Sequence, residues 1–333
     1  MTTGFSDNVR PEQIDRGLPT YFQPKINTMA KKLIIEAAIP GWQPVQWWRD
    51  HGVTKLPPIT IEDQADAIVE CVKAGASVIH THPRDPATTR MLVHGSDLLI
   101  QIMDRAFKEV DFITATHTWS WDFTKSHAVD YITYTRELLE KGKGNKYCQS
   151  ALVMTLGVFN TNNVVFEAGP TKEGVAWLEA NGVKPMYSIQ AYSFRTFKEL
   201  LFDSGISKWK PHWLALQLGK HTDDQIYVDP WSYIQTITNL ALIKEEMPDA
   251  LLGIHPSGRN WLPVSVIALL YGAELIRVGL EDQFWLYPHR DDVSQRASDT
   301  VKLIADIAKL LGREIATVDE ARQRLGMKLT SRL

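Results

Sequence analysis

The amino-acid sequence predicts an α/β protein, a (β/α)8 TIM barrel with an N-terminal extension. Short runs of strand-forming residues alternate with helical stretches along nearly all of the 333 residues. Most of these runs are continuously apolar, as parallel strands buried on both faces are. Eight such units over roughly 250 residues match the strand count and the length of this barrel. We expect residues 1–31 to form the extension and residues 32–333 the catalytic barrel domain.

Eight strands are expected along the chain. They are residues 32–40, 77–85, 111–119, 149–157, 184–192, 213–219, 251–258 and 274–282. The alternative is a doubly wound open sheet. Against this alternative, no phosphate-binding G-x-G-x-x-G or G-x-x-x-x-G-K-[ST] motif opens a helix.

The stretches between the strands carry helix-capping residues. Thr60 begins the run T-I-E-D-Q, in which a hydroxyl side chain precedes a carboxylate by three residues. Thr317 and Glu320 repeat this capping-box pattern near the C-terminus. Asp229 and Pro230 supply a cap and a first-turn proline for a further helix. These residues predict helix starts between the expected strands.

Bulk composition excludes several classes of protein. The chain is 44% hydrophobic and 23% charged, as soluble globular proteins are. A formal net charge of −3, with dispersed basic residues, indicates no nucleic-acid partner. No apolar run approaches the ~20 residues that cross a membrane, and the start MTTGFSDNVRPEQIDRG lacks the pattern of a secretory signal. Cys71 and Cys148 are too few for a disulfide framework, so we expect a cytoplasmic protein.

Two histidines close the second expected strand. His80 and His82 are two residues apart, so on a strand their imidazoles point to the same face, which in a barrel is the interior. Barrel active sites lie at the C-terminal ends of the strands, where this pair stands. A hydrogen-bonded core pair is the structural alternative, but each buried ring then needs its own partners. A divalent metal, zinc above all, satisfies both rings at once.

Carboxylates at neighbouring strand ends are candidates to complete a metal site. Glu281 ends the last expected strand, and Glu36 lies on the first strand, which in a closed barrel stands between the last and the second. We expect Glu281 to be the third ligand and Glu36 to be either a fourth ligand or an acceptor behind the ligands. Carboxylates in apolar strands are rarely tolerated without partners. Two imidazoles, one carboxylate and an open position form a typical catalytic zinc site, which can polarise a carbonyl or carboxylate oxygen.

An arginine and an aspartate accompany this glutamate in the last strand. Arg277 can bind a substrate carboxylate or orient Asp282. Asp282 can then act as a general base, provided that it reaches the substrate. A structural salt bridge at the rim of the barrel explains the same pair equally well.

Polar residues also end the third strand and follow the second. Thr116, His117 and Thr118 offer hydroxyl or imidazole contacts to a substrate. Arg84 and Asp85 are expected to hold the loop after the second strand. Tryptophans after the first and third strands form a candidate substrate rim, namely Trp42, Trp47, Trp48, Trp119 and Trp121.

The seventh strand is followed by a candidate phosphate-binding loop. Gly258, Arg259 and Asn260 lie where barrels often bind the phosphate of a cofactor or substrate. His255, within the same strand, and His221 are expected to be structural.

Four segments resemble one known enzyme family. They are LIIEAAIPG with Glu36, LPPITIEDQADAIVECVKAGASVIHTHPRD, IRVGLED and AKLLGREIATVDEARQRLG, and they span about residue 32 to residue 327. In this order they resemble the β-keto acid cleavage enzymes, the family of 3-keto-5-aminohexanoate cleavage enzyme. The His-x-His-x-Arg-Asp and Arg-Val-Gly-Leu-Glu-Asp segments together make the resemblance specific.

The resemblance implies a zinc-dependent acyl transfer of the retro-Claisen type, carried out by a homotetramer. A 3-oxo acid and the co-substrate acetyl-CoA would give acetoacetate and the CoA ester of the remaining acyl group. The resemblance implies that Zn²⁺ contacts the carboxylate and 3-oxo oxygens of the substrate. The implied metal ligands are the residues already singled out, His80, His82 and Glu281. Asp282, positioned by Arg277, would be the base, and the third strand near Thr116 would contact the substrate.

The sequence departs from the family pattern in two places. After Lys184 and Pro185 the family commonly has glutamates in the fifth strand, whereas here Met186, Tyr187 and Ser188 follow. The loop DPATTRMLVHG after the second strand also differs from the usual acidic or glycine-rich loop. The missing glutamates predict a substrate with a neutral or apolar tail, with a quaternary ammonium tail held by tryptophans as the rival.

Two other interpretations compete with this one. A metal-dependent barrel hydrolase of the amidohydrolase kind usually carries His-x-His on its first strand, whereas here the pair lies on the second strand and Glu36 on the first. A requirement for CoA separates the two enzymes. A ligand-binding or structural barrel would use the histidines for packing only, and metal analysis of the purified protein distinguishes it.

Overall fold

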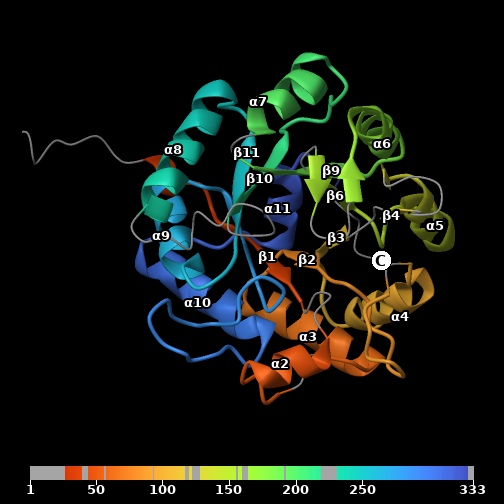
Figure 1. Cartoon of the computed structure of the whole chain (residues 1–333), viewed down its shortest axis with the longest axis vertical. Helices are drawn as coiled ribbons and strands as arrows, with labels where there is room; N and C mark the ends of the chain where they lie inside the picture. Colours follow the sequence, from red (N-terminus) through yellow and green to blue (C-terminus); the bar gives the residue numbers. More distant parts are fainter. Residues whose placement is uncertain are drawn as a thin grey trace, which may run out of the picture.

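Hydrogen bonding between neighbouring strands closes a barrel in the computed structural model of the chain (Figure 1). The strand order is β1-β12-β11-β10-β9-β6-β3-β2, and each neighbouring pair is parallel. The strands are β1 (Ile34–Ala38), β2 (Val78–His80), β3 (Ile113–Thr116), β6 (Ser150–Met154), β9 (Lys184–Ile189), β10 (Trp213–Leu218), β11 (Leu251–Pro256) and β12 (Leu275–Val278). Each lies within one of the eight predicted runs, so the predicted (β/α)8 TIM barrel is confirmed.

The structure describes most of the chain, with gaps. The described residues are 27–39, 44–55, 58–92, 94–116, 120–121, 128–154, 157–159, 164–190, 193–218 and 231–328. Several predictions therefore lie outside the described residues. These are most of the 1–31 extension, the last five residues of the predicted barrel domain, Trp42, His117, Thr118, Trp119, His221, Asp229 and Pro230.

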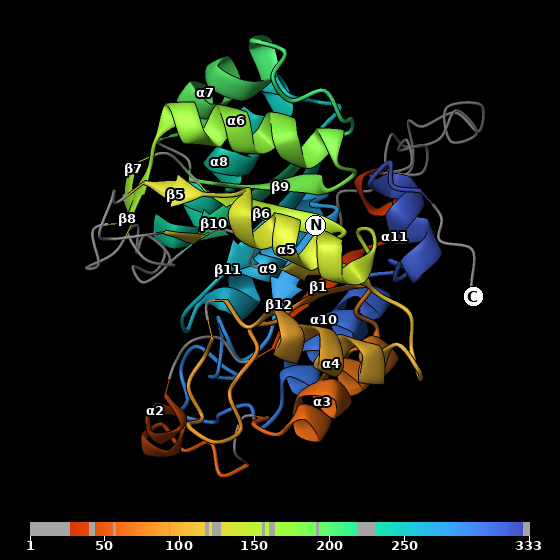
Figure 2. The ribbon, with the colours of Figure 1, turned by 90° about the vertical axis from the view of Figure 1, so that its right-hand side faces the viewer.

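Helices surround the barrel and carry the chain back between strands (Figures 1 and 2). The longer ones are α3 (Ile61–Ala74), α4 (Ser96–Ala106), α5 (Thr133–Gly142), α6 (Ala168–Ala180), α8 (Trp231–Glu246), α9 (Trp261–Tyr271) and α10 (Ala297–Leu310). The shorter elements are η2 (Asn27–Met29), α2 (Val45–Asp50), α7 (Phe194–Phe197), η4 (Lys198–Asp203) and α11 (Val318–Arg324). Two small antiparallel sheets pair β4 (Ser120–Trp121) with β5 (Val129–Asp130) and β7 (Gly157–Phe159) with β8 (Val164–Phe166). Among the described helices, none combines the length and the apolarity that a membrane crossing requires.

The predicted capping boxes begin α3 and α11. The Thr60 hydroxyl accepts a hydrogen bond from the backbone N–H of Asp63 (3.0 Å), and the Asp63 carboxylate accepts one from the N–H of Thr60 (3.3 Å). Thr317 and Glu320 make the same reciprocal pair. Both caps satisfy backbone donors that the first helical turn leaves without partners.

Strand register decides which side chains face the interior of the barrel. Parallel neighbours in register point to the same face, and the face alternates along each strand. Glu36 pairs with Arg277, and Ala38 pairs with His80. Arg277, Glu36 and His80 therefore lie on the inner wall, contributed by the adjacent strands β12, β1 and β2.

A glycine at the end of β12 turns the chain back over the barrel. Gly279 has φ +139°, and a side chain there would overlap the carbonyl oxygen of Ala38. The backbone N–H groups of Asp282 and Gln283 both donate to the carbonyl of Gly279, at 3.1 and 2.9 Å. This turn brings Glu281 and Asp282 back over the strand that carries Arg277.

We predict that Gly279→Ala destabilises the protein strongly, because the new methyl group meets backbone and the φ value disfavours any side chain. The free energy of unfolding should fall by more than ~3 kcal/mol in urea titrations. Gly169→Ala is the matched control, since Gly169 lies in α6 with open space around it. The control should change stability by less than ~1 kcal/mol. Equal stability of the two variants would contradict this view of the turn.

Candidate metal centre

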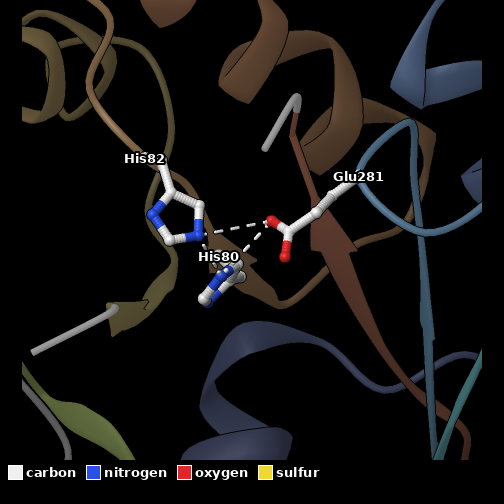
Figure 3. Close-up of side chains that lie close together, drawn as sticks. All are labelled: His80, His82 and Glu281. Carbon is white, nitrogen blue, oxygen red and sulfur yellow. Dashed lines mark hydrogen bonds and ion pairs between the residues drawn. The ribbon is translucent and has the colours of Figure 1, made fainter. Parts of the chain in front are cut away.

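The side chains of His80 and His82 converge with that of Glu281, about 200 residues later in the sequence, at the C-terminal end of the barrel (Figure 3). The Nε2 atoms of His80 and His82 are 3.1 Å apart. Oε2 of Glu281 lies 3.4 Å from the first and 3.6 Å from the second. All three residues are buried. The structure thus brings together the three residues that the sequence predicted as metal ligands.

The spacing of these atoms fits a tetrahedral zinc ion. Zinc binds imidazole nitrogen and carboxylate oxygen at ~2.0–2.2 Å, which in a tetrahedron separates ligand atoms by about 3.3–3.5 Å. The measured separations of 3.1, 3.4 and 3.6 Å bracket this range. Two imidazoles and a carboxylate are also the ligand types that zinc prefers at catalytic sites. The donor set therefore fits a divalent cation with at least one coordination position left for substrate.

A backbone carbonyl orients the first imidazole. Nδ1 of His80 lies 2.7 Å from the carbonyl oxygen of Ala115 on β3, so Nδ1 carries the proton and donates it. The lone pair of Nε2 then points toward His82 and Glu281. Metal-bound histidines are commonly fixed by such an outer hydrogen bond, which sets the tautomer and the ring orientation.

The guanidinium of Arg277 holds three carboxylates inside the barrel. Nε lies 2.7 Å from Asp282, one terminal nitrogen lies 2.6 Å from Oε1 of Glu281, and the other lies 3.5 Å from Glu36. Burial alone would lower the pKa of Arg277, but these carboxylates raise it above its ordinary value. Three formal negative charges against one positive charge leave two negative charges, which a divalent cation would balance.

Glu36 lies behind the three predicted ligands. One of its oxygens faces Arg277, and the other lies 3.3 Å from Nε2 of His255. Of the two roles left open for Glu36, this geometry supports the acceptor and not the fourth ligand. Burial would raise the pKa of its carboxyl group, but the hydrogen bond from His255 and the charge of Arg277 hold the pKa below its ordinary value.

His255 belongs to this polar group, whereas the sequence predicts a structural role for it. Nδ1 lies 3.5 Å from the amide nitrogen of Gln217, the neighbouring residue on β10, and Nε2 lies 3.3 Å from Oε2 of Glu36. Burial lowers the pKa of His255, although the nearby carboxylate of Glu36 opposes this effect. One signal was available in the sequence: His255 stands near the C-terminal end of a strand, the criterion that selected His80.

Thr116 is not brought together with the other predicted site residues. Ile113 of β3 pairs with Val78, which shares the inner face with His80, so Ala115 faces inward and Thr116 faces the surrounding helices. The hydroxyl group of Thr116 lies beside the thiol of Cys148. The register therefore favours a structural role for this threonine.

The predicted phosphate loop between β11 and α9 is tied to its surroundings. The N–H of Gly258 donates to the carbonyl of Asp282 (3.3 Å). Arg259 donates to the carbonyl of Arg290 (2.8 Å), pairs with Asp291, and lies 4.2 Å over the ring of Trp285. Asn260 precedes the first residue of α9. The loop thus adjoins Asp282, and the ion-pair partner of its arginine, Asp291, is exposed.

The structure also gives the contacts of the residues predicted after β2 and of two of the predicted rim tryptophans. Arg84 donates to the carbonyl of Thr89 (3.0 Å), and the Asp85 carboxylate accepts from the backbone N–H of Ala87 (2.9 Å), so both hold the loop after β2. Trp47 and Trp48 pack edge-on against Phe284, which follows β12. These tryptophans therefore form an aromatic group between the segments after β1 and β12.

The chain is similar to known proteins over most of its length. A model of the β-keto acid cleavage enzyme family matches residues 32–327. A 3-keto-5-aminohexanoate cleavage enzyme of Fusobacterium nucleatum is 27% identical over 304 residues, covering 90% of this chain and 100% of the relative. A 3-dehydrocarnitine:acetyl-CoA trimethylamine transferase of Rhizobium meliloti is 24% identical over 310 residues, covering 83% and 91%.

A solved structure shows the same fold. The chain superposes on ObcA, in a ternary complex with a C4-CoA adduct and oxalate, with a TM-score of 0.65 and 17% sequence identity. The match covers 81% of this chain and 67% of ObcA. At this identity the similarity supports the barrel fold alone.

We predict that His82→Ala removes the metal while the barrel stays folded. The affinity for zinc should fall by more than ~100-fold, since loss of an outer partner of a ligand alone costs 10–100-fold. Elemental analysis after dialysis measures the bound metal, and circular dichroism checks the fold. His289→Ala, at an exposed histidine, is the control and should keep the metal. Full metal occupancy in a His80→Ala/His82→Ala double variant would show that the site is elsewhere.

Proposed function

The chain belongs to the β-keto acid cleavage enzyme family, and on this premise we propose that it is a zinc-dependent acyltransferase acting on a 3-oxo acid and acetyl-CoA. The products are acetoacetate and the CoA ester of the remaining acyl group. One C–C bond of the 3-oxo acid breaks, one C–C bond forms in acetoacetate, and CoA passes from the acetyl group to the released acyl group. The observation that carries this proposal is the triad of His80, His82 and Glu281, whose glutamate shares the guanidinium of Arg277 with Glu36 and Asp282.

Asp282 is the proposed general base. Its side chain is buried, and Arg277 holds one of its oxygens at 2.7 Å. A carboxylate fixed in this way can take a proton alpha to the 3-oxo group without a costly change of position. Zinc held by the triad would supply the Lewis acid that lowers the cost of enolate charge. Glu36 and His255 support the other side of the guanidinium and so keep it in place.

Acetyl-CoA is the proposed co-substrate. The name of the Rhizobium meliloti relative includes acetyl-CoA, and the proposed reaction needs CoA to take up the released acyl group. We place the CoA phosphates near Gly258, Arg259 and Asn260, at the start of α9. Support comes from the adjacency of this loop to Asp282 and from the ion pair of Arg259 with Asp291, whose exposed side chain a phosphate can replace.

A homo-oligomer, with a tetramer as the family resemblance suggests, and a cytoplasmic location complete the proposal. Helix α9 has no charged residue, and Leu270 on it is 54% exposed. The neighbouring helix α8 exposes Ile234 and Ile237. Helices that are apolar on all sides are usually buried, and another subunit would cover this face. Both cysteines are buried thiols, which suits a reducing compartment.

Among the described residues, strands β6 and β9 of the inner wall opposite the triad carry no carboxylate. Met186 and Ser188 face inward, because they pair with Leu152 and Met154 of β6 and alternate with Tyr187, whose hydroxyl points outward to Ser207. A buried ammonium group would need a carboxylate partner on this wall. We therefore propose that the substrate tail is neutral or apolar, in place of the primary amine that glutamates at these positions would accept.

We predict that Asp282→Asn keeps zinc but loses most turnover. The amide has nearly the same shape but cannot accept the proton, so kcat should fall about 10²–10⁴-fold. Asp249→Asn, in an exposed turn before β11, is the matched control and should leave kcat unchanged. The readouts are acetoacetate formation and zinc content of the same preparations. A near-normal kcat with metal bound would move the role of base to another group, with Glu36 the next candidate.

We also predict a preference among three 3-oxo acids of similar length, offered together with acetyl-CoA. The acid with an alkyl tail should have a kcat/KM at least about tenfold above that of the acid with a primary amine, because the described residues of β6 and β9 offer no carboxylate to a buried ammonium. An acid with a trimethylammonium tail is the rival, since aromatic faces can hold such a cation through cation–π contacts. A clear preference for the primary amine would show that another acidic residue lines the tail pocket.

A further inference from the structure

Four basic residues gather at the end of the barrel opposite the triad. Lys31 precedes β1, Lys244 lies in the last turn of α8 before β11, Arg313 follows α10, and Arg324 ends α11. We call them the basal cationic cluster. Strands begin at this end, so the cluster is separated from the catalytic residues by the length of the barrel. Figure 2 shows the start of the described chain, in red, beside α11.

Arg313 is the buried centre of this cluster. The residue is 1% exposed, and its Nε donates to the carbonyl of Lys31 at 2.8 Å. Neither of its two terminal nitrogens has a hydrogen-bond partner within the part of the chain that the structure describes. Burial lowers the pKa of Arg313 to about 10, and no carboxylate offsets this effect. A guanidinium in this position is strongly destabilising unless an acceptor meets it.

The surroundings of Arg313 add positive charge rather than an acceptor. Burial and the charges of Arg324 and Arg313 lower the pKa of Lys31. Burial and the charges of Lys31 and Arg313 lower the pKa of Lys244, whose ammonium donates to the carbonyls of Tyr271 (3.3 Å) and Gly272 (3.2 Å). The positive charges of Arg313 and its neighbours therefore disfavour the charged forms of Lys31 and Lys244.

The ion pairs of the basal cationic cluster involve one carboxylate for four basic residues, within the part of the chain that the structure describes. Among the described residues, the ion pairs of the cluster end on Glu274, which lies 2.7 Å from Lys31 and also contacts Arg324. Neither Arg313 nor Lys244 has an ion pair within the same described ranges. The cluster therefore carries an excess of positive charge around the two buried terminal nitrogens of Arg313.

We propose that the basal cationic cluster binds a small oxyanion, such as phosphate or a carboxylate, on the terminal nitrogens of Arg313. The guanidinium fork presents two N–H groups that match two oxygens of one anion. Lys31 and Lys244 add charge from two sides. A bound anion joins the segment before β1 to the ends of α8 and α10, so it stabilises the closure of the barrel between its first and last strands. This site is independent of the acyl transfer proposed above.

The test is the melting temperature of the full chain, titrated with inorganic phosphate at constant ionic strength set with chloride. Phosphate should raise the melting temperature by about 2–5 °C at millimolar concentration, because it binds the folded state. Sulfate and acetate in parallel titrations distinguish tetrahedral from planar oxyanions. No stabilisation by any of the three beyond that of chloride would overturn the proposal.

Arg313→Met is the variant that isolates the site, since its side chain has similar length and no charge. It should lose the phosphate response and should melt no lower than the natural chain when both are free of oxyanions, because an unpaired buried charge has been removed. Arg136→Met, at an exposed arginine of α5, is the matched control and should keep the response. Lys31→Met leaves the core intact and should weaken phosphate binding about tenfold, as measured by calorimetry. This second variant tests the proposal even if Arg313→Met does not fold. An unchanged phosphate response in both Arg313→Met and Lys31→Met would refute it.

Discussion

The guanidinium of Arg277 lies inside the barrel with carboxylates from two neighbouring strands around it, and the catalytic end of the molecule is arranged by these contacts. Its Nε holds Asp282 and one terminal nitrogen holds Glu281, so the general-base candidate and the carboxylate ligand share one anchor. The other terminal nitrogen faces Glu36. A lysine could not replace this residue, because a single ammonium cannot present three separate directions in one plane.

This anchor also selects which oxygen of Glu281 meets the histidines. Oε1 accepts from Arg277, so Oε2 is the atom that lies beside His80 and His82. The turn at Gly279 makes the arrangement possible, since it lets two residues that follow the strand return above the arginine within it. The proposed metal ligand, the proposed base and their anchor therefore come from one short segment, and a change of backbone there would alter all three.

The two halves of the inner wall have different chemistry, and this difference orients a substrate. Strands β11, β12, β1 and β2 contribute His255, Arg277, Glu36 and His80 to one half. Strands β6 and β9 contribute Met154 and Ser188 to the other. A 3-oxo acid placed with its polar end toward the first half directs its tail toward the second. In the proposed function, the chemistry of the reaction and the choice of tail therefore belong to separate strands.

The sequence by itself determined the eight strands, the caps at Thr60 and Thr317, and the grouping of His80 and His82 with Glu281, because each depends on local pattern and on position at a strand end. Other features depend on register between strands far apart in the chain. Register turned Thr116 away from the interior and paired His255 with Gln217 and Glu36, and no local pattern distinguishes these outcomes. Arg313 is similar, since its burial arises only when α10 closes against the segment before β1. The periodicity of apolar residues is a property of one segment. The contacts between side chains of different strands arise only when the barrel closes, so only the tertiary structure decides them.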